Sequence, residues 1–145
     1  MPPSHPTSSE ARRLALRVVT MPRDTNQYGT IFGGVILSYI DQAGFIEARH
    51  HGCHRWVTAS IERVDFRAPV LLGDALNLYT HAIRLGEKSV TVAVDVEAER
   101  YITDDTVPVT SATITMVAIN AAGHPIPFRS PPSVDPPPPL AGARH

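Results

Sequence analysis

Residues 31–46 constrain the fold most strongly, because they are apolar on nearly every face of the helix that they are expected to form. A helix of this kind belongs in the middle of a fold rather than on its surface. Asp41 stands in the middle of the helix, where an unpaired charge would be costly. The apolar positions are Phe32, Val35, Ile36, Leu37, Tyr39, Ile40, Ala43, Phe45 and Ile46.

The loop before this helix carries a second constraint. Residues 22–29 contain the proline, glycine and short polar residues of a turn, so we expect a helix start there, with Thr30 as the N-cap residue. Gly33 and Gly34 follow in the first turn, although glycine is a poor helix former. They indicate that another backbone or a ligand approaches the free N–H groups at this end. Simple helix packing is the alternative explanation.

Composition limits the kind of protein. A chain of 145 residues with 43% hydrophobic residues can bury one core, so we expect one domain. A net charge of -1 gives no general reason to expect a nucleic acid or an anionic membrane as partner. The single Cys53 excludes an internal disulfide and fits a reducing compartment. With no apolar signal segment at the start of the sequence, we expect a cytoplasmic protein.

Three stretches divide the chain. Residues 1–12 are rich in proline, serine and arginine and are expected to be disordered. Eight of the 14 prolines fall between Pro125 and Pro139, so residues 126–145 are expected to form an extended or disordered tail. The folded domain is therefore expected over residues 13–125.

Alternating apolar residues predict five strands around the helix. One strand is expected near 14–18, before the helix, and four follow it near 57–66, 76–81, 90–97 and 110–120. The apolar parity switches near Glu62 or Arg63, which predicts a bulge in the first of these four. Turns are expected at Gly73 and Gly86, and an exposed loop at residues 103–108. The sequence thus predicts an α+β fold in which one antiparallel sheet curls around the helix and a second subunit covers the remainder.

This order, together with four segments, resembles the hotdog-fold acyl-CoA thioesterases, in particular the small bacterial YciA-like group. The segments are MPRDTNQYGTIFGG, the helical Asp41, VDFRAPVLLGD and VAINAAGHPIP. The resemblance covers residues 14–127, and its most specific part is Asn-x-x-Gly-x-x-x-Gly-Gly followed by the helical aspartate. It implies a hotdog fold and hydrolysis of acyl-CoA thioesters to the free acid and coenzyme A.

Thioester hydrolysis needs a base or nucleophile at the carbonyl carbon and donors at the carbonyl oxygen. Asp41 is the candidate carboxylate, either activating a water or attacking directly. The N–H group of Gly33 or Gly34 is the candidate oxyanion donor, and the amide of Asn26 could position water or the carbonyl. The alternatives are a structural carboxylate at Asp41 and an ordinary turn residue at Asn26.

The spacing of these residues predicts a dimer. Gly33 and Asp41 lie eight positions apart, about 12 Å along a helix, whereas both must come within about 3 Å of one reacting centre. They must therefore come from two chains whose helices run antiparallel across a two-fold axis, giving two equivalent sites per dimer. The resemblance also implies dimers, and suggests a trimer of dimers.

Coenzyme A carries phosphates, so basic residues should face its entrance. Arg63, Arg67, Arg84 and Lys88 are candidates, and Ser89 could donate to a phosphate oxygen. Ordinary surface charges are the alternative. Coenzyme A is part of the substrate, so no separate cofactor is expected.

Other interpretations of the sequence lead elsewhere. His50, His51, Cys53 and His54 cluster after the helix, but their spacing matches no standard zinc pattern and we expect no metal. Glu47 is expected to be a solvated or paired helix residue. A hotdog hydratase would need a histidine near the helix start, where this loop has asparagine, glutamine and tyrosine. A hotdog protein that binds acyl-CoA without turnover is the remaining alternative.

Overall fold

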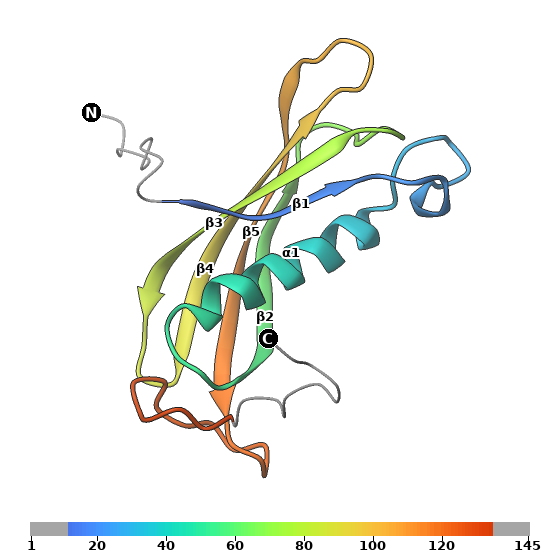
Figure 1. Ribbon diagram of the computed structural model, residues 1–145. Helices are drawn as coiled ribbons and strands as arrows, with labels where there is room; N and C mark the ends of the chain where they lie inside the picture. Colours follow the sequence, from blue (N-terminus) through green and yellow to red (C-terminus); the bar gives the residue numbers. More distant parts are fainter. Residues whose placement is uncertain (1–11, 135–145) are drawn as a thin grey trace, which may run out of the picture.

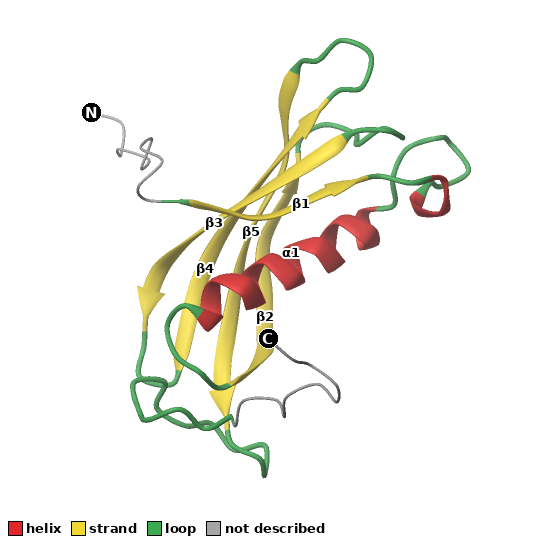
Figure 2. Ribbon diagram, viewed as in Figure 1, coloured by secondary structure: helices red, strands yellow, loops and turns green. Residues whose placement is uncertain are grey.

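The computed structural model describes residues 12–134. One long helix, α1 (Gly33–Arg49), lies across one face of a curved five-stranded antiparallel sheet (Figures 1 and 2). The strands are β1 (Arg13–Val19), β2 (Arg55–Phe66), β3 (Ala75–Leu85), β4 (Ser89–Glu99) and β5 (Thr106–Ile119), and a 3-10 turn, η1, spans Pro22–Asp24. The element order and α+β class that the sequence predicts are confirmed. Among the described residues, no helix is long and apolar enough to cross a membrane.

The sheet has the order β1-β3-β4-β5-β2, so β1 and β2 form its two edges. Strand β4 is central, and its residues Val90, Val92, Val94 and Val96 are buried under the helix, as their strict alternation predicts. The register of β2 against β5 shifts between Glu62 and Asp65, and Arg63 has a positive φ of 54°. The predicted bulge is therefore present at Arg63.

Strand β5 is longer than the sequence indicates. The loop expected at residues 103–108 is wrong in its second half, because β5 already begins at Thr106. Pairing of Val107 with Ala98 and of Pro108 with Glu97 extends the hairpin beyond the apolar stretch on which the expectation rested. Pro108 lacks an N–H donor, and the register shifts beside it, between Val96 and Glu97.

Helix α1 begins at Gly33, and its N-cap residue is Phe32, two residues after the expected cap Thr30. Thr30 is occupied elsewhere, because its hydroxyl accepts a hydrogen bond from the amide of Asn26 at 2.8 Å and its backbone bridges to Leu71. The helix therefore starts only after the chain has left the loop. It ends at Arg49, with His50 as the C-cap residue.

Helix α1 approaches the sheet closely near its middle. A Cβ atom at Gly44 would lie 2.7 Å from Cγ2 of Ile114 on β5, so only glycine allows this contact. The helix is not buried all round within one chain, because Gly34, Ser38, Gln42 and Phe45 are exposed. This exposed stripe recurs every three to four residues and is the face that the sheet leaves uncovered.

Residues 126–134 of the expected tail pack against the domain. Phe128 is 3% exposed and packs on Trp56, with 5.9 Å between ring centroids. Ile126 donates its N–H to the Ala118 carbonyl at 2.9 Å, and the Ser133 N–H donates to the Cys53 carbonyl at 3.0 Å. Residues 126–134 thus belong to the folded domain, because they supply apolar side chains and backbone partners. Residues 135–145 and 1–11 lie outside the described residues.

Candidate active site

Asp41 lies in the middle of α1, half-buried on the side of β2. The Thr58 hydroxyl on β2 donates a hydrogen bond to Oδ1 of Asp41. The same hydroxyl lies 3.6 Å from the sulfur of Met116, whose side chain is buried beneath it. Among the described residues Thr58 is the one recorded hydrogen-bond partner of this carboxylate. The second carboxylate oxygen is therefore available to a water or a substrate.

Asn26 organises the loop that precedes α1. Its side-chain oxygen accepts hydrogen bonds from the backbone N–H groups of Tyr28 and Thr30, at 2.9 and 3.1 Å. Its amide nitrogen donates to the Thr30 hydroxyl at 2.8 Å. The turn role of Asn26 is thus present in this chain. An amide nitrogen carries two hydrogens, so one donor remains for a second partner.

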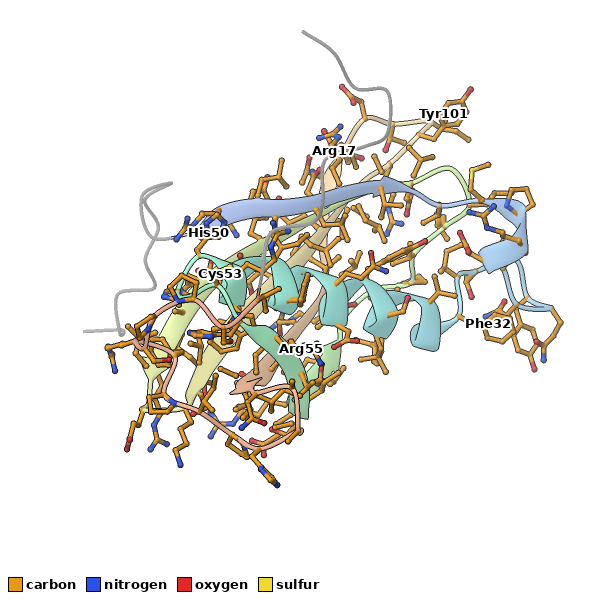
Figure 3. All side chains as sticks on the ribbon, turned by 60° about the horizontal axis from the view of Figure 1, so that its bottom comes forward. Arg17, Phe32, His50, Cys53, Arg55 and Tyr101 are labelled. Carbon is orange, nitrogen blue, oxygen red and sulfur yellow. The ribbon has the colours of Figure 1, made fainter. Side chains whose placement is uncertain are left out.

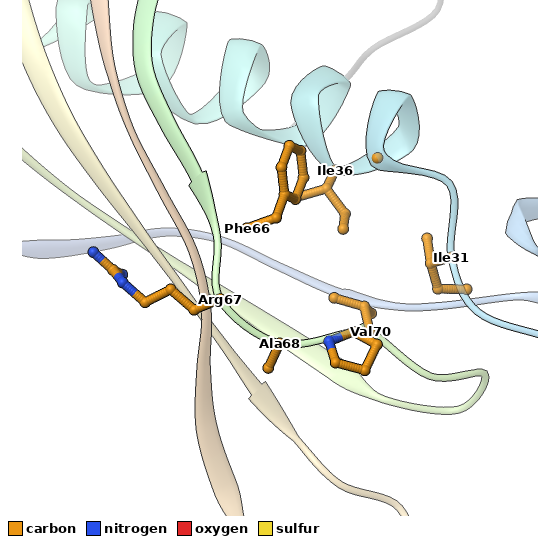
Figure 4. A pocket seen from close by; sticks show the side chains of 8 residues that line it. Ile31, Ile36, Phe66, Arg67, Ala68 and Val70 are labelled. Carbon is orange, nitrogen blue, oxygen red and sulfur yellow. The ribbon is translucent and has the colours of Figure 1, made fainter.

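The start of α1 offers backbone donors beside a cavity. No side chain among residues 12–134 caps this end, and the N–H groups of Gly33 and Gly34 have no preceding helical carbonyl to bond. A cavity of about 350 Å³ opens there (Figure 4). Its lining consists of Ile31, Gly33, Ile36, Phe66, Arg67, Ala68, Pro69 and Val70.

Contact with Phe66 accounts in part for the glycine at position 33, but not for the glycine at position 34. A Cβ atom at Gly33 would lie 3.3 Å from Cζ of Phe66, a tight contact, whereas a Cβ at Gly34 would meet no described atom within 4 Å. Packing inside this chain therefore accounts for glycine at position 33 only in part and at position 34 not at all. Figure 4 shows Phe66 directed toward the helix and Arg67 directed away from it.

One protomer does not bring the predicted residues together. Gly33 is the first residue of α1 and Asp41 the ninth, so about 12 Å separates them along the axis. Asn26 and Arg67 lie at the Gly33 end. Asp41 lies level with Thr58, which pairs with Met116 on β5. Each protomer thus carries two different halves of the predicted constellation.

The remaining basic candidates lie apart from this end of the helix. Lys88 lies in the β3–β4 turn, and Ser89 is the first residue of β4, where it pairs with Val117. Seven residues further along β4, Val96 pairs with Thr110, which in turn pairs with Phe66 beside the Gly33 cavity. About 23 Å of strand therefore separates Ser89 from the level of that cavity. Arg63 and Arg84 meet on the sheet face opposite α1, where they line a separate hollow of about 370 Å³.

His51 and His54 of the histidine cluster form hydrogen bonds within the domain. The ring of His51 lies 2.9 Å from a carboxylate oxygen of Glu47. His54 is buried between the Phe128 carbonyl and the Ser133 hydroxyl, at 2.8 and 2.6 Å. Within residues 12–134, no group of three or more His, Cys, Asp or Glu side chains is placed to hold a metal ion.

Glu47 is a paired helix residue, which is one of the two alternatives that the sequence leaves open. The sequence does not predict that it is buried. It is 2% exposed and accepts a hydrogen bond from the Thr80 hydroxyl at 3.0 Å. Arg13 on β1 lies 3.5 Å from its other oxygen. This network joins the last turn of α1 to β1 and β3, on the opposite side of the helix from Asp41.

Sequence reasoning missed Thr58. The residue lies 17 positions after Asp41 and belongs to a strand whose register shifts between Thr58 and Ser60. Its side-chain direction depends on that irregularity, which moves Trp56 and Thr58 to the helix side of the sheet. A threonine in a predicted strand carries no local signal of such a contact.

The family model described as "Thioesterase superfamily" matches residues 28–101, which include the glycine loop, α1, β2, β3 and β4. The acyl-CoA thioester hydrolase YciA of Escherichia coli is 33% identical over 115 residues, which are 77% of this chain and 87% of that protein.

Two solved structures show the same arrangement. The hexameric hotdog-fold thioesterase Cj0915 of Campylobacter jejuni is 41% identical, with a TM-score of 0.75 over 79% of this chain and 88% of that one. An acyl-CoA hydrolase of Staphylococcus aureus, solved with butyryl coenzyme A and coenzyme A, is 29% identical, with a TM-score of 0.72 over 82% of this chain and 72% of that one. The fold is therefore shared with these enzymes, and the chain belongs to the thioesterase superfamily as a hotdog-fold relative of the YciA-like acyl-CoA thioester hydrolases.

Proposed function

We infer that this chain hydrolyses acyl-CoA thioesters to the free acid and coenzyme A. The observation that carries this function is the half-buried Asp41, held by Thr58 and left with one oxygen open, in a chain of this family. A protein that only bound acyl-CoA would have no use for a positioned carboxylate beside the thioester. A hydratase is not supported, since the loop before α1 carries Asn26 where that chemistry would need a histidine.

Asp41 acts on the carbonyl carbon by one of two routes. It takes a proton from a water that attacks the thioester, or its own oxygen attacks and forms a mixed anhydride that water then splits. In both routes the carbon–sulfur bond breaks and a thiolate leaves. It takes up the proton that Asp41 removed from water in the first route, and a proton from solvent in the second, where the water that splits the anhydride releases one in return. The developing charge on the carbonyl oxygen is stabilised by the N–H of Gly33 or Gly34 of a second chain, beside Asn26. No cofactor takes part, because coenzyme A is part of the substrate.

The second chain pairs along the open edge of β2. This strand of 12 residues pairs with β5 on one side only, so within the described residues its outer edge exposes a row of backbone donors and acceptors. Phe66 on this strand, which lies against Gly33, and Phe45 on α1 add exposed apolar side chains on the helix side of the sheet. A second copy of the chain covers both the strand edge and the helix face that the sheet leaves open.

Two contacts inside one chain support a single position for the proposed two-fold axis. If Asp41 faces the partner's Gly33, antiparallel helices are centred midway between these positions, on Leu37. Thr58 touches Asp41 and Phe66 lies against Gly33, so the same arrangement centres antiparallel β2 strands midway between them, on Glu62. One axis thus serves the helices and the strands together, which supports a composite site.

Arg67 is the strongest of the coenzyme A candidates. It lines the cavity beside Gly33, whereas Arg63 lies on the opposite face of the sheet. A guanidinium at the rim suits a phosphate group. Lys88 and Ser89 stand near the level of Asp41, so they would contact the nucleotide from the other chain of the dimer. Cytoplasmic location stays a prediction that fits the single cysteine.

Release of free coenzyme A tests the function. We expect the wild-type protein to release thiol from saturated acyl-CoA substrates, and to lower the absorbance of an enoyl-CoA only in step with thiol release. Cys53 is an exposed thiol, so the assay uses the Cys53→Ser variant alongside wild type. Loss of the enoyl absorbance without thiol release would identify a hydratase. Binding without either reaction would identify an acyl-CoA-binding protein.

Replacement of Thr58 by valine is expected to lower kcat about tenfold with little change in KM. Valine keeps the shape of threonine but cannot donate to Asp41, so the carboxylate loses the hydrogen bond that orients it. Thr58→Ser, which retains the hydroxyl, is the matched control and should keep most of the activity. Equal losses in both variants, in steady-state assays, would show that packing against Met116 matters rather than the hydroxyl.

Three dimers are proposed to form a hexamer, and the Campylobacter relative is hexameric. The β4–β5 turn supports this, because Tyr101 and Ile102 are 81% and 90% exposed beside Leu71 and Leu72. We expect sedimentation equilibrium to give six times the chain mass of 15.7 kDa, about 94 kDa. Ile102→Asp should reduce the mass to that of a dimer and leave hydrolysis intact. An unchanged hexamer would place the contact elsewhere.

A further inference from the structure

A second apolar hollow lies at the far end of α1, and the catalytic proposal does not use it. It has a volume of about 310 Å³ and sits between the last two turns of the helix and the residues that lead into β2. Figure 3 shows Cys53 at this end and Phe32 at the other end of the helix. The hollow is lined by Phe45, Arg49, Gly52, Cys53, His54 and Val134.

The hollow continues the line on which Asp41 lies. Phe45 follows Asp41 by one turn on the same helix face, and Arg49 follows by two. On the opposite side, β2 runs back antiparallel from Cys53 and His54 to Thr58, which holds Asp41. A groove thus runs between α1 and β2, with the Asp41–Thr58 contact at one end. The hollow occupies the other end, where the chain turns from α1 into β2.

The C-terminal segment forms a fixed wall of this hollow. Val134 lines it, and the neighbouring Ser133 bonds to Cys53 through its N–H and to His54 through its hydroxyl. His54 also bonds the carbonyl of the buried Phe128, so three contacts tie residues 128–134 to the end of the groove. The wall therefore ends the groove at a defined depth.

We propose that this hollow receives the distal end of the substrate's acyl chain, with Phe45, Cys53 and Val134 setting the longest chain that fits. This inference rests on the proposed hydrolysis of acyl-CoA. Phe45 and Arg49 lie about 6 and 12 Å beyond Asp41 along the helix, and an extended chain advances about 1.2 Å per bond. Straight acyl groups of about six to ten carbons reach from the reacting carbon into the hollow. Arg49 keeps its charge outside, with its guanidinium 5.7 Å from the centroid of the Phe45 ring.

Bulk introduced into the hollow should shorten the accepted chain. We expect Cys53→Phe to lower kcat/KM for octanoyl-CoA and decanoyl-CoA at least tenfold, and to leave acetyl-CoA and butyryl-CoA within twofold of wild type. Val134→Phe fills the hollow from the opposite wall and should give the same profile if the first variant fails to fold. His50→Phe, exposed and outside the lining, is the matched control. A loss that is equal at every chain length, or absent at every length, would overturn the proposal.

The single thiol gives a readout that needs no turnover. Cys53 is exposed and lines the hollow, so a bound chain should shield it from N-ethylmaleimide. A saturating non-hydrolysable S-decyl thioether of coenzyme A is expected to slow alkylation at least tenfold, and the S-ethyl thioether less than twofold. Equal protection by both, or protection by neither, would place the acyl chain elsewhere. The measurement remains valid if the protein binds acyl-CoA without hydrolysing it, which separates this inference from the proposed function.

Discussion

The Asp41→Asn variant is expected to hydrolyse acyl-CoA about a thousandfold more slowly than wild type, with its structure unchanged. The amide has nearly the shape of the carboxylate and its oxygen still accepts the hydrogen bond from Thr58. It can neither take a proton from water nor attack a thioester, and loss of a general base costs about a hundredfold to ten-thousandfold. Steady-state thiol release measures the effect, with single-turnover assays at high enzyme concentration for the variant.

The control for Asp41→Asn makes the same chemical change away from the helix. Asp104 lies exposed in the β4–β5 turn with a φ of 60°, a conformation that asparagine adopts readily. Asp104→Asn should therefore retain full activity. Thermal unfolding and sedimentation should not distinguish the two variants from wild type. Hydrolysis by Asp41→Asn at more than a tenth of the wild-type rate would exclude Asp41 as base or nucleophile.

A mixture of two inactive variants is expected to recover about one quarter of wild-type activity. Gly33→Pro removes the N–H at the first helical position, where proline is well tolerated. Loss of an oxyanion donor costs about a hundredfold to a thousandfold. In a dimer of one Gly33→Pro chain and one Asp41→Asn chain, one site has both defects and the other has neither. Random pairing makes half of the dimers mixed, each with one intact site, which gives about one quarter.

Two controls make this mixing experiment specific. Gly33→Ala keeps the N–H and adds a Cβ near Phe66, so it reports the steric cost alone. Mixing Asp41→Asn chains with chains that carry both substitutions should recover nothing, because no mixed dimer then has an intact site. The chains must be unfolded and refolded together, or co-expressed, so that they exchange. If the mixture of Gly33→Pro and Asp41→Asn chains is no more active than either variant alone, Asp41 and Gly33 do not share a site.

The parts of the fold that could be predicted are those with a local periodic signal. Val90 to Val96 alternate strictly, so β4 was evident, and the parity change beside Arg63 located a bulge. The helix was predicted from its apolar residues, but its first residue was not. Thr30 is a good N-cap in isolation, and a contact with Asn26 inside the loop takes its hydroxyl away. Such competition between tertiary and local partners is invisible in sequence.

The site was predictable in its residue types but not in its surroundings. Asp41, Gly33 and Asn26 were recognised through their spacing and resemblance, and their shared role in one site stays a prediction. Thr58 became visible only when β2 was placed beside α1. Residues 126–134 were assigned to a disordered tail because proline dominates the composition there. Phe128 overrides that composition, since one buried aromatic ring and a few backbone hydrogen bonds are enough to hold a short segment.

The order of the sheet also bears on how the chain folds during synthesis. Strands β3, β4 and β5 are consecutive hairpins, but β1 and β2, which flank α1 in sequence, occupy the two opposite edges. The first half of the chain therefore supplies the two edges of a sheet whose middle strands, β3, β4 and β5, are synthesised later. Arg13 on β1 pairs with Thr80, and Arg55 on β2 pairs with Ile119. Loops of this length close at an entropic cost before their contacts form. The apolar helix α1 thus leaves the ribosome well before the surface that covers it, and we expect it to depend on chaperones for that interval.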